Sequence, residues 1–400
     1  MEKEIDIDFN QPIARDGTHA EKYEARLELF GRADVLPMWV ADMDLPTPPF
    51  VLDAIRQRLD HPILGYTAMS DQSFQAIIDW QLQHGYRVSR EQIVFTHNVA
   101  NGLFLAVRAL TRPGDAVLIQ PPIYPPFSKA VQINDRRLVT APLVLEDGQY
   151  QIDFAAFEHA IVEHQVKLFL LCNPHNPAGR VWSKTDLQRL ADICLGYGVT
   201  MVSDEIHSDL VYAPHVHTPL ASLSADVAAQ TLTLSAPGKT FNLAGLQIGY
   251  GISANSQIKQ AFEQEAQRVK IHDLNLFAMI ALEAAYSEQG KVWRDKLLVH
   301  FQQNIGLLKS FFARHFPAVK VINPQASYLV WLDFRAMFSD HQVLKSWLIN
   351  QAKLGLNDGL SYGEPGRGFM RINIAVPQST LQQAFEQLLA AKGDSNGALS

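Results

Sequence analysis

The feature of this sequence that most constrains its fold is an alternation, in the middle of the chain, of short apolar runs with helix-period segments. The apolar runs occupy residues 92–96, 116–120, 167–171, 200–205, 231–235 and 248–253. Most of them are apolar at nearly every position, which is typical of strands buried on both faces. The segment 183–198 is typical of the helices between them, with Ser183 as N-cap and Asp186 three residues later. We therefore predict an α/β fold, with a mostly parallel central sheet covered by helices on both faces.

The remainder of the chain predicts a second, smaller unit. After about residue 255 the pattern becomes long and helical, and the segment 291–316 is expected to link domains. Shorter mixed elements follow at 327–334, 339–353, 370–376 and from about 379. A chain of 400 residues is long enough for two domains. We predict a large α/β domain over 50–290 and a small α+β domain over 291–400, with the N-terminal segment 1–49 belonging to the small domain.

Composition excludes several classes of protein. The net charge of −7, without a basic block, argues against nucleic-acid binding. No apolar stretch approaches the ~20 residues that cross a bilayer, so we expect no membrane association. The charged start of the chain does not resemble a secretion signal. Cys172 and Cys194 lie in apolar surroundings and form no CxxC pair, which favours a reducing compartment. We expect a cytoplasmic protein.

Polar residues follow the ends of several predicted strands. In an open α/β sheet, ligands bind beyond the carboxyl ends of the strands, so these residues are expected to meet at one edge. They are His97, Asn98 and the Val99–Gly102 helix start, then Tyr124, Asn173, Asn176, Arg180, Asp204, Glu205, His207 and Lys239. Each has an ordinary explanation when taken alone. A loop lysine is commonly a solvated charge, "NPHNP" a turn, Asp204 a helix N-cap and Tyr124 a packing residue.

Taken together, these residues supply the groups that pyridoxal 5′-phosphate (PLP) requires. PLP needs an amine for a Schiff base, an anion beside its pyridine nitrogen and a site for its phosphate. Lys239 is the candidate amine, and a desolvated pocket would favour its reactive neutral form. Asp204 is the candidate pyridinium partner, expected to stay ionised beside a cation. Asn176 can bind the phenolic oxygen and Tyr124 can stack on the ring. The helix start at Val99 and Ala100 can donate N–H groups to the phosphate.

Longer stretches of the chain resemble the fold-type I PLP-dependent enzymes of the class I/II aminotransferase superfamily. Within it they are most similar to the MalY/PatB-type C–S lyases, the branch of cystathionine β-lyase and cystalysin-like enzymes. The matching stretches cover nearly the whole chain: "PMWVADMDLPTPP" (37–49), "LGYT" (64–67), "PPIYPPF" (121–127), "CNPHNPAGRVW" (172–182), "SDEIHSDLVY" (203–212), "APGKTFNLAGLQIGYG" (236–251), "SYLVWLDFR" (327–335) and "RINIAVP" (371–377).

The resemblance implies roles for further residues. Lys239 would be the Schiff-base lysine, with Asp204, Asn176 and Tyr124 around the ring. Arg371 would bind the substrate α-carboxylate, with Val40 also near the substrate. The active sites would be shared across a homodimer. Tyr66 would act from the neighbouring subunit on the cofactor phosphate or the substrate, and Lys239 or a tyrosine (Tyr66 or Tyr124) would protonate the leaving thiol. The remaining implied cofactor contacts are His207 and Ser235.

Three stretches depart from the family pattern. His97-Asn98 replaces a small residue or Pro-Gly, Gly238 replaces a serine before the lysine, and "PQASYL" (324–329) replaces a "PEGTYL"-like stretch. Ser235 or Thr240 is therefore an alternative contact for the phosphate. These departures leave open how the phosphate is bound and which substrate is preferred.

The implied function is α,β-elimination from cystathionine or another S-substituted cysteine. The products would be a thiol such as homocysteine, pyruvate and ammonia, a reaction that fits methionine biosynthesis. Two alternatives use the same residues: a class I/II aminotransferase, and a PLP-binding regulatory protein. A metal hydrolase using His207, His215 and His217 is disfavoured because no further ligand cluster is evident, and we expect no metal. The glycine-rich "GEPGRG" (363–368) lacks the lysine of a P-loop and is expected to be a loop.

Overall fold

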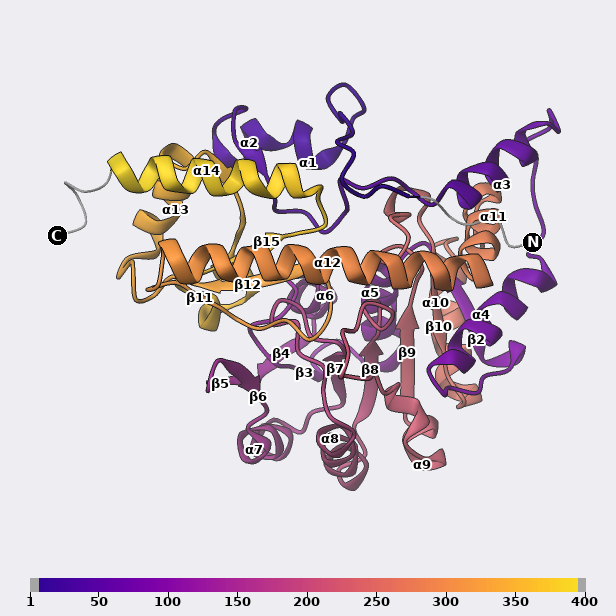
Figure 1. Cartoon of the computed structure of the whole chain (residues 1–400). Coiled ribbons are helices and arrows are strands. Elements are labelled where there is room, and N and C mark those ends of the chain that lie inside the picture. Colours follow the sequence, from indigo (N-terminus) through magenta and orange to yellow (C-terminus); the bar gives the residue numbers. More distant parts are fainter. Residues whose placement is uncertain (1–6, 395–400) are drawn as a thin grey trace.

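The computed structural model describes residues 7–394 and contains the predicted central sheet. The order of its seven strands is β2-β10-β9-β8-β7-β3-β4 (Figure 1). Their bounds are β2 Ile93–Thr96, β3 Ala116–Ile119, β4 Arg137–Thr140, β7 Leu168–Cys172, β8 Thr200–Asp204, β9 Thr231–Ser235 and β10 Gly249–Ile252. Strand β10 is antiparallel to both of its neighbours and every other pairing is parallel. The α/β prediction is confirmed.

Helices cover both faces of this sheet, because each strand points alternate apolar side chains to opposite faces. In β3, Val117 and Ile119 join the core cluster beneath α5, α6 and α10, whereas Ala116 and Leu118 join the cluster beneath α7 and α8. These helices are α5 Val99–Leu110, α6 Pro126–Ile133, α7 Phe154–His164, α8 Lys184–Gly196 and α10 Ser256–Arg268. Ser183 caps α8 in a capping box with Asp186, as predicted.

A second, antiparallel sheet has the order β11-β12-β15-β14 and lies at the other end of the long helix α12 (Figure 1). Its elements are α12 Glu288–His315, β11 Lys320–Val321, β12 Leu329–Asp333, α13 His341–Asn350, β14 Asn357–Asp358, β15 Phe369–Asn373 and α14 Gln378–Asp394. The N-terminal strand β1 (Leu36–Pro37) pairs in parallel with β13 (Leu354–Gly355). This pairing supports assigning the N-terminal segment to the small unit, although the domain limits stay a prediction and residues 1–6 and 395–400 lie outside the described part.

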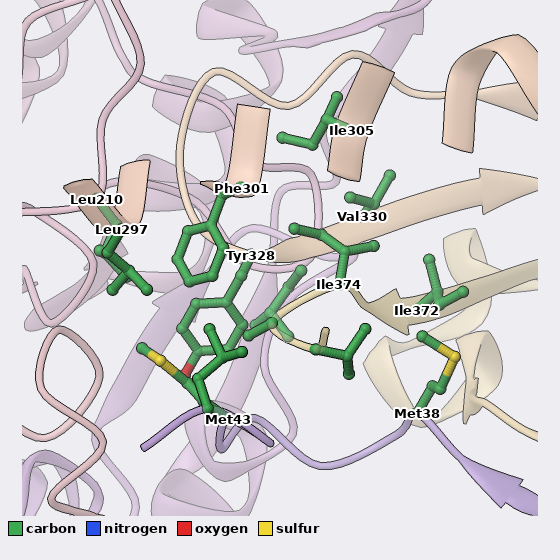
Figure 2. Packing of buried hydrophobic residues seen from close by; sticks show 14 of the residues in the cluster. Met38, Met43, Leu210, Leu297, Phe301, Ile305, Tyr328, Val330, Ile372 and Ile374 are labelled. Atoms are coloured by element: carbon green, nitrogen blue, oxygen red, sulfur yellow. The ribbon is translucent and has the colours of Figure 1, made fainter. Parts of the chain in front are cut away.

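The N-terminal segment is held over the small unit by a continuous apolar core. Figure 2 shows Met43 of this segment beside Tyr328 and Met38 beside Ile372, with Phe301 of α12 next to Tyr328. Val330 of β12 and Ile372 of β15 complete the same cluster. The packing fixes the backbone of residues 38–43, and this backbone forms one wall of the site described below.

The remaining elements are shorter or lie outside the two main sheets. They are α1 Glu21–Glu24, α2 Arg26–Phe30, α3 Pro49–Leu59, α4 Asp71–Gln83, the hairpin β5 Val144–Glu146 and β6 Gln149–Gln151, α9 Ala225–Ala229 and α11 Leu276–Ala285. No helix within residues 7–394 is both long and apolar enough to cross a membrane.

Candidate active site

A cavity of about 350 Å³ lies beyond the carboxyl ends of β7, β8 and β9. Cys172 and Asp204 end β7 and β8, and Ala236 follows β9, and all three line the cavity. This is the edge at which the strand-end residues are expected to meet. Of the residues expected to meet there, eight line this cavity: Asn98, Val99, Ala100, Tyr124, Asn176, Asp204, His207 and Lys239.

Lys239 lies in the turn after β9, and its Nζ donates a hydrogen bond to the Ala41 carbonyl at 2.6 Å. Burial, assisted by the charge of Arg371, lowers the pKa of the Lys239 amine to about 8. Asp42 and Asp204 oppose this shift but do not cancel it. A lysine with such a pKa has an accessible neutral form near physiological pH, which a nucleophilic amine requires.

Asp204 is the last residue of β8, and its Oδ1 accepts a hydrogen bond from the Ile206 amide at 3.1 Å. Burial raises the pKa of the Asp204 carboxyl to about 7, while that hydrogen bond and the charge of Lys239 lower it. We expected Asp204 to stay ionised, but with a pKa of about 7 the carboxyl is only partly ionised at neutral pH in the protein alone. A cation placed against the carboxylate would stabilise the ionised form.

Arg371, on β15, brings the small unit into the site. It is 1% exposed, and its Nη1 and Nη2 donate to Asn176 Oδ1 at 3.0 Å and to the Trp39 carbonyl at 2.9 Å. Its Nε has no partner, and within residues 7–394 no carboxylate pairs with this guanidinium. A buried charge without a counter-ion is costly, so the site is suited to an anionic ligand.

Asn176 and Tyr124 are joined through the backbone, because the Tyr124 amide donates to the Asn176 carbonyl at 3.2 Å. The Asn176 Oδ1 accepts from Arg371, which leaves the amide Nδ2 to donate into the cavity. Burial raises the pKa of the Tyr124 hydroxyl, so this group stays protonated and able to donate.

Helix α5 begins at the cavity with Val99 and Ala100 in its lining. The Asn98 side chain caps the helix by accepting from the Asn101 amide at 2.8 Å, and it donates to Gln247 Oε1 at 2.6 Å. The other N–H groups of the first turn, together with the positive end of the helix dipole, suit a phosphate.

The alternative phosphate contacts are not in the cavity lining. Thr240 is buried and its hydroxyl donates to Asp209 at 2.9 Å, and Ser235 is buried within β9. Gly238 does line the cavity, and a Cβ added there would meet Ala244 only at 3.9 Å. Nothing in the local packing therefore requires glycine rather than serine at this position.

His207 is a buried, neutral residue. Burial, with the charges of Lys239 and Arg371, lowers the pKa of its imidazole to about 3. Its Nδ1 is buried without a partner, and its ring lies edge-on to Tyr328, with the centroids 6.4 Å apart. Its predicted contact with the cofactor stays a prediction.

Two further predicted residues, Tyr66 and Val40, are not part of the cavity lining. Tyr66 is fully exposed, with a relative accessibility of 111%. Val40 offers its carbonyl to Asn373 at 2.7 Å, and the neighbouring Ala41, rather than Val40, lines the cavity. The roles proposed for both residues stay predictions.

The contribution of the backbone of residues 39–44 to the site was not predicted from the sequence. The Ala41 carbonyl accepts from Lys239 and from the Tyr328 hydroxyl, and Trp39 accepts from Arg371. The acids of this stretch are held by basic residues upstream: Asp42 by Arg15, and Asp44 by Arg15 and the fully buried Lys22. One feature of the sequence could have indicated this role. Asp42 and Asp44 flank an apolar residue in a segment otherwise rich in apolar side chains.

His217, one of the three histidines considered for a metal hydrolase, contacts a carboxylate of its own chain. His217 is buried and its Nε2 lies 2.9 Å from Glu205 Oε2. Within residues 7–394, no group of three or more His, Cys, Asp or Glu side chains is arranged to hold a metal ion. Glu205 also accepts from Ser203 at 2.8 Å and from the Leu220 amide at 3.0 Å, so this carboxylate is part of the fold.

Comparison with known proteins extends these observations. The family described as aminotransferase class I and II matches residues 33–388. The chain is 44% identical to cystathionine β-lyase PatB of Bacillus subtilis, over 96% of this chain and 100% of the relative. Its fold is similar to that of cystalysin from Treponema denticola, a structure that contains PLP, with a TM-score of 0.94, 34% identity and coverage of 97% and 99%. A PLP-bound putative aminotransferase from Clostridium difficile also has a TM-score of 0.94, with 36% identity and coverage of 96% and 100%.

Proposed function

The chain belongs to the class I and II aminotransferase family, and from that premise we propose that it is a PLP-dependent C–S lyase acting on cystathionine or related S-substituted cysteines. The observation that carries the substrate class is Arg371, a buried guanidinium without a carboxylate partner among residues 7–394. An amino acid substrate supplies that carboxylate, and the fork of the arginine suits it. The lyase reaction is supported by the similarity to cystathionine β-lyase PatB and to cystalysin.

The residues of the cavity fit PLP. The start of α5 offers N–H groups to the phosphate, Asp204 offers an anion to the ring nitrogen and Asn176 Nδ2 offers a donor to the phenolic oxygen. Tyr124 supplies an aromatic face, and Lys239 supplies an amine whose pKa is lowered to about 8, mainly by burial. When bound, PLP withdraws electrons from the bonds at the substrate Cα, most strongly while its ring nitrogen is protonated.

Residues of the chain then bind the substrate and transfer protons during the elimination. Arg371 holds the α-carboxylate and so fixes the Cα–H bond relative to Lys239. The Lys239 amine takes the Cα proton as general base. A nearby acid, Lys239 itself or the hydroxyl of Tyr124, gives a proton to the sulfur as the Cβ–S bond breaks. The products are a thiol and, after hydrolysis of the remaining three-carbon unit, pyruvate and ammonia.

This function is tested by incubating the purified holoenzyme with L-cystathionine in the absence of any keto acid. Pyruvate and free thiol should form in equal amounts, and Lys239→Ala should reduce the rate by at least about a thousandfold, since it removes both the base and the attachment of the cofactor. Full lyase activity in Lys239→Ala would contradict the assignment of this residue.

An aminotransferase is the second candidate, favoured by the similarity to the C. difficile putative aminotransferase. It would use the same base and the same carboxylate site, and would differ in returning the proton to the cofactor. Turnover that occurs only when a keto acid is added, without release of thiol, would support this reaction over the lyase. A purely regulatory role, the third alternative, would be supported if neither reaction were detected.

We further propose a cytoplasmic homodimer in which Tyr66 reaches the active site of the neighbouring subunit. Tyr66 is fully exposed, and it lies beside two further exposed apolar residues, Ile63 and Leu64, at 65% and 58%. Such a group of apolar side chains is typical of an interaction surface. The unpaired, buried Cys172 and Cys194 favour a reducing compartment. With cystathionine as substrate, release of homocysteine would place the enzyme in methionine biosynthesis.

A further inference from the structure

The rim of the active-site cavity carries an acidic side chain to which none of the steps above gives a role. Three residues of the lining are exposed: Glu21 on α1, Ala244 and Gln247. Glu21 is the charged one. None of the ion pairs found among residues 7–394 includes it, whereas the adjacent Lys22 is buried and paired with Asp42 and Asp44.

The charge of Glu21 also reaches the interior of the cavity. Burial is the main cause of the raised pKa of the Tyr124 hydroxyl, and Glu21 and Asp204 add to it, while Arg371 opposes it. Tyr124 lies against Asn176, to which Arg371 is hydrogen-bonded. Glu21 therefore lies within electrostatic range of the place where the substrate is held.

Glu21, Lys239 and Asn176 line the same cavity, and Asn176 is hydrogen-bonded to the buried Arg371. Glu21 is the exposed member of this set, so its carboxylate lies where the cavity meets solvent. A substrate whose α-carboxylate is bound by Arg371 has its Cβ substituent free to extend toward the opening. A positively charged tip on that substituent would approach Glu21, and a neutral tip would gain nothing from it.

We propose that Glu21 determines substrate preference, favouring S-substituted cysteines whose leaving thiol carries an ammonium group. The leaving halves of cystathionine and of cystine both carry an ammonium group next to a carboxylate, so the effect of Glu21 is largest for a tip with an ammonium group alone. This inference rests on the proposed lyase function and identifies which thiol-bearing substrates that function prefers. Glu21 takes no part in breaking bonds, so its effect is confined to the choice of substrate.

The test uses two substrates of nearly equal size, S-(2-aminoethyl)-L-cysteine and S-propyl-L-cysteine, which differ in the charge of the tip. We expect Glu21→Gln in the holoenzyme to lower kcat/KM for the aminoethyl substrate about three- to fivefold, the range of a partly exposed ion pair, and to leave the propyl substrate unchanged. Glu21→Lys should lower the aminoethyl value further. Raising the ionic strength from about 0.1 to 1 M should screen most of the effect of Glu21. The kcat/KM of the unmodified enzyme for the aminoethyl substrate should then approach that of Glu21→Gln.

Glu24→Gln is the matched control. Glu24 is exposed on the same helix but does not line the cavity, and its substitution changes the net charge by the same amount. This variant should keep the substrate ratio of the unmodified enzyme. An equal ratio in the unmodified enzyme and in Glu21→Gln would overturn the inference while leaving the lyase function intact.

Binding provides a readout that does not depend on turnover. L-Lysine and L-2-aminoheptanoate have the shapes of the two substrates but no leaving group, and calorimetry with the holoenzyme measures their affinities. Glu21→Gln should weaken L-lysine about three- to fivefold and leave 2-aminoheptanoate unchanged. Absence of that shift contradicts the inference. Absence of pyruvate from either sulfur substrate, with the shift present, contradicts the proposed function alone.

Discussion

Lys239 and Asp204 illustrate how burial prepares a site for chemistry at the scale of single residues. Burial disfavours the charged form of both, so the amine has a pKa of about 8 and the carboxyl a pKa of about 7. The two shifts bring a base and an acid that normally differ by more than six pKa units to within about one unit of each other. Both groups can therefore change charge near neutral pH.

The raised pKa of Asp204 predicts a cost in stability that depends on pH. In the cofactor-free protein, Asp204→Asn should leave the free energy of unfolding unchanged below about pH 4, where the carboxyl is protonated in both the folded and the unfolded state. Between about pH 4 and 7 the unfolded chain ionises first, so the unmodified protein loses stability as pH rises and the variant gains by comparison. The gain should reach a few kcal/mol above pH 7.

Urea denaturation of the two cofactor-free proteins at pH 4, 6 and 8 measures this difference. Asp226→Asn, at an exposed acid on α9, is the control and should show no gain that grows with pH. An Asp204→Asn variant that is less stable at pH 8 would show that other contacts of the carboxylate outweigh its burial. The variant should also bind PLP less tightly, if Asp204 is the anion beside the ring nitrogen as proposed.

At the scale of elements, the N-terminal segment contributes main-chain groups rather than side chains. The Trp39 and Ala41 carbonyls are bound by Arg371 and Lys239, and Asn373 donates to the carbonyls of Val40 and Asp42. A short piece of irregular backbone is thereby held in a fixed position between two sheets. The positions of these carbonyls depend on the ion pairs that anchor the segment.

Lys22 is the buried member of those ion pairs. Lys22→Met should lower the free energy of unfolding by about 2–3 kcal/mol, because Asp44 stays buried with only Arg15 as a partner. Denaturation by urea measures the loss. The exposed Lys320, changed to Met, is the control and should alter stability by less than about 0.5 kcal/mol. A similar small effect in Lys22→Met would mean that this pair does not anchor the segment.

The elements that the sequence predicted well are those with strong periodicity. The six apolar runs became strands because they are apolar at nearly every position, and α8 begins at Ser183 because the capping box is local. Strand β4 was missed because it is an edge strand whose residues Arg137 and Thr140 are exposed and polar. Strands β1 and β13 have two residues each, and their pairing depends on a partner more than 300 residues away, which no local pattern reveals.

At the scale of the whole molecule, the proposed dimer makes a prediction about mixtures. Tyr66→Phe and Lys239→Ala subunits should each form weakly active homodimers. If Tyr66 acts across the interface, a dimer of one subunit of each kind carries one site with both residues intact. Random pairing makes about half of the dimers mixed, and one of the two sites in each mixed dimer is intact. Mixing and reassociating the two variants should therefore restore up to about a quarter of the normal activity.

The measurement is lyase activity after reassociation, with dimer formation verified by sedimentation. It tests whether Tyr66 acts in the site of the neighbouring subunit. A mixture of Tyr66→Phe with itself, treated in the same way, is the control and should show no recovery. Recovery that is absent although mixed dimers are present would place Tyr66 outside the neighbouring site.

The residues of the candidate site could be predicted from the sequence where they directly follow a strand. Lys239, Asp204, Asn176 and Tyr124 line one cavity because parallel strands bring their carboxyl ends together. Arg371 was found by resemblance alone, since it lies within β15 of the other sheet and no rule of strand ends applies to it. Glu21 carried no signal in the sequence, because only the packing of the N-terminal segment brings it to the rim.

The hydrogen bond between Trp39 and Arg371 joins residues 332 positions apart. During synthesis, residues 39–44 leave the ribosome early and the helix start, Asp204 and Lys239 follow, but Arg371, the residue proposed to bind the substrate carboxylate, emerges close to the end. The nascent chain therefore has no complete substrate site until translation is nearly finished. A premature stop before codon 371 is expected to leave a chain that has the groups proposed to hold PLP but lacks the arginine proposed to hold the amino acid.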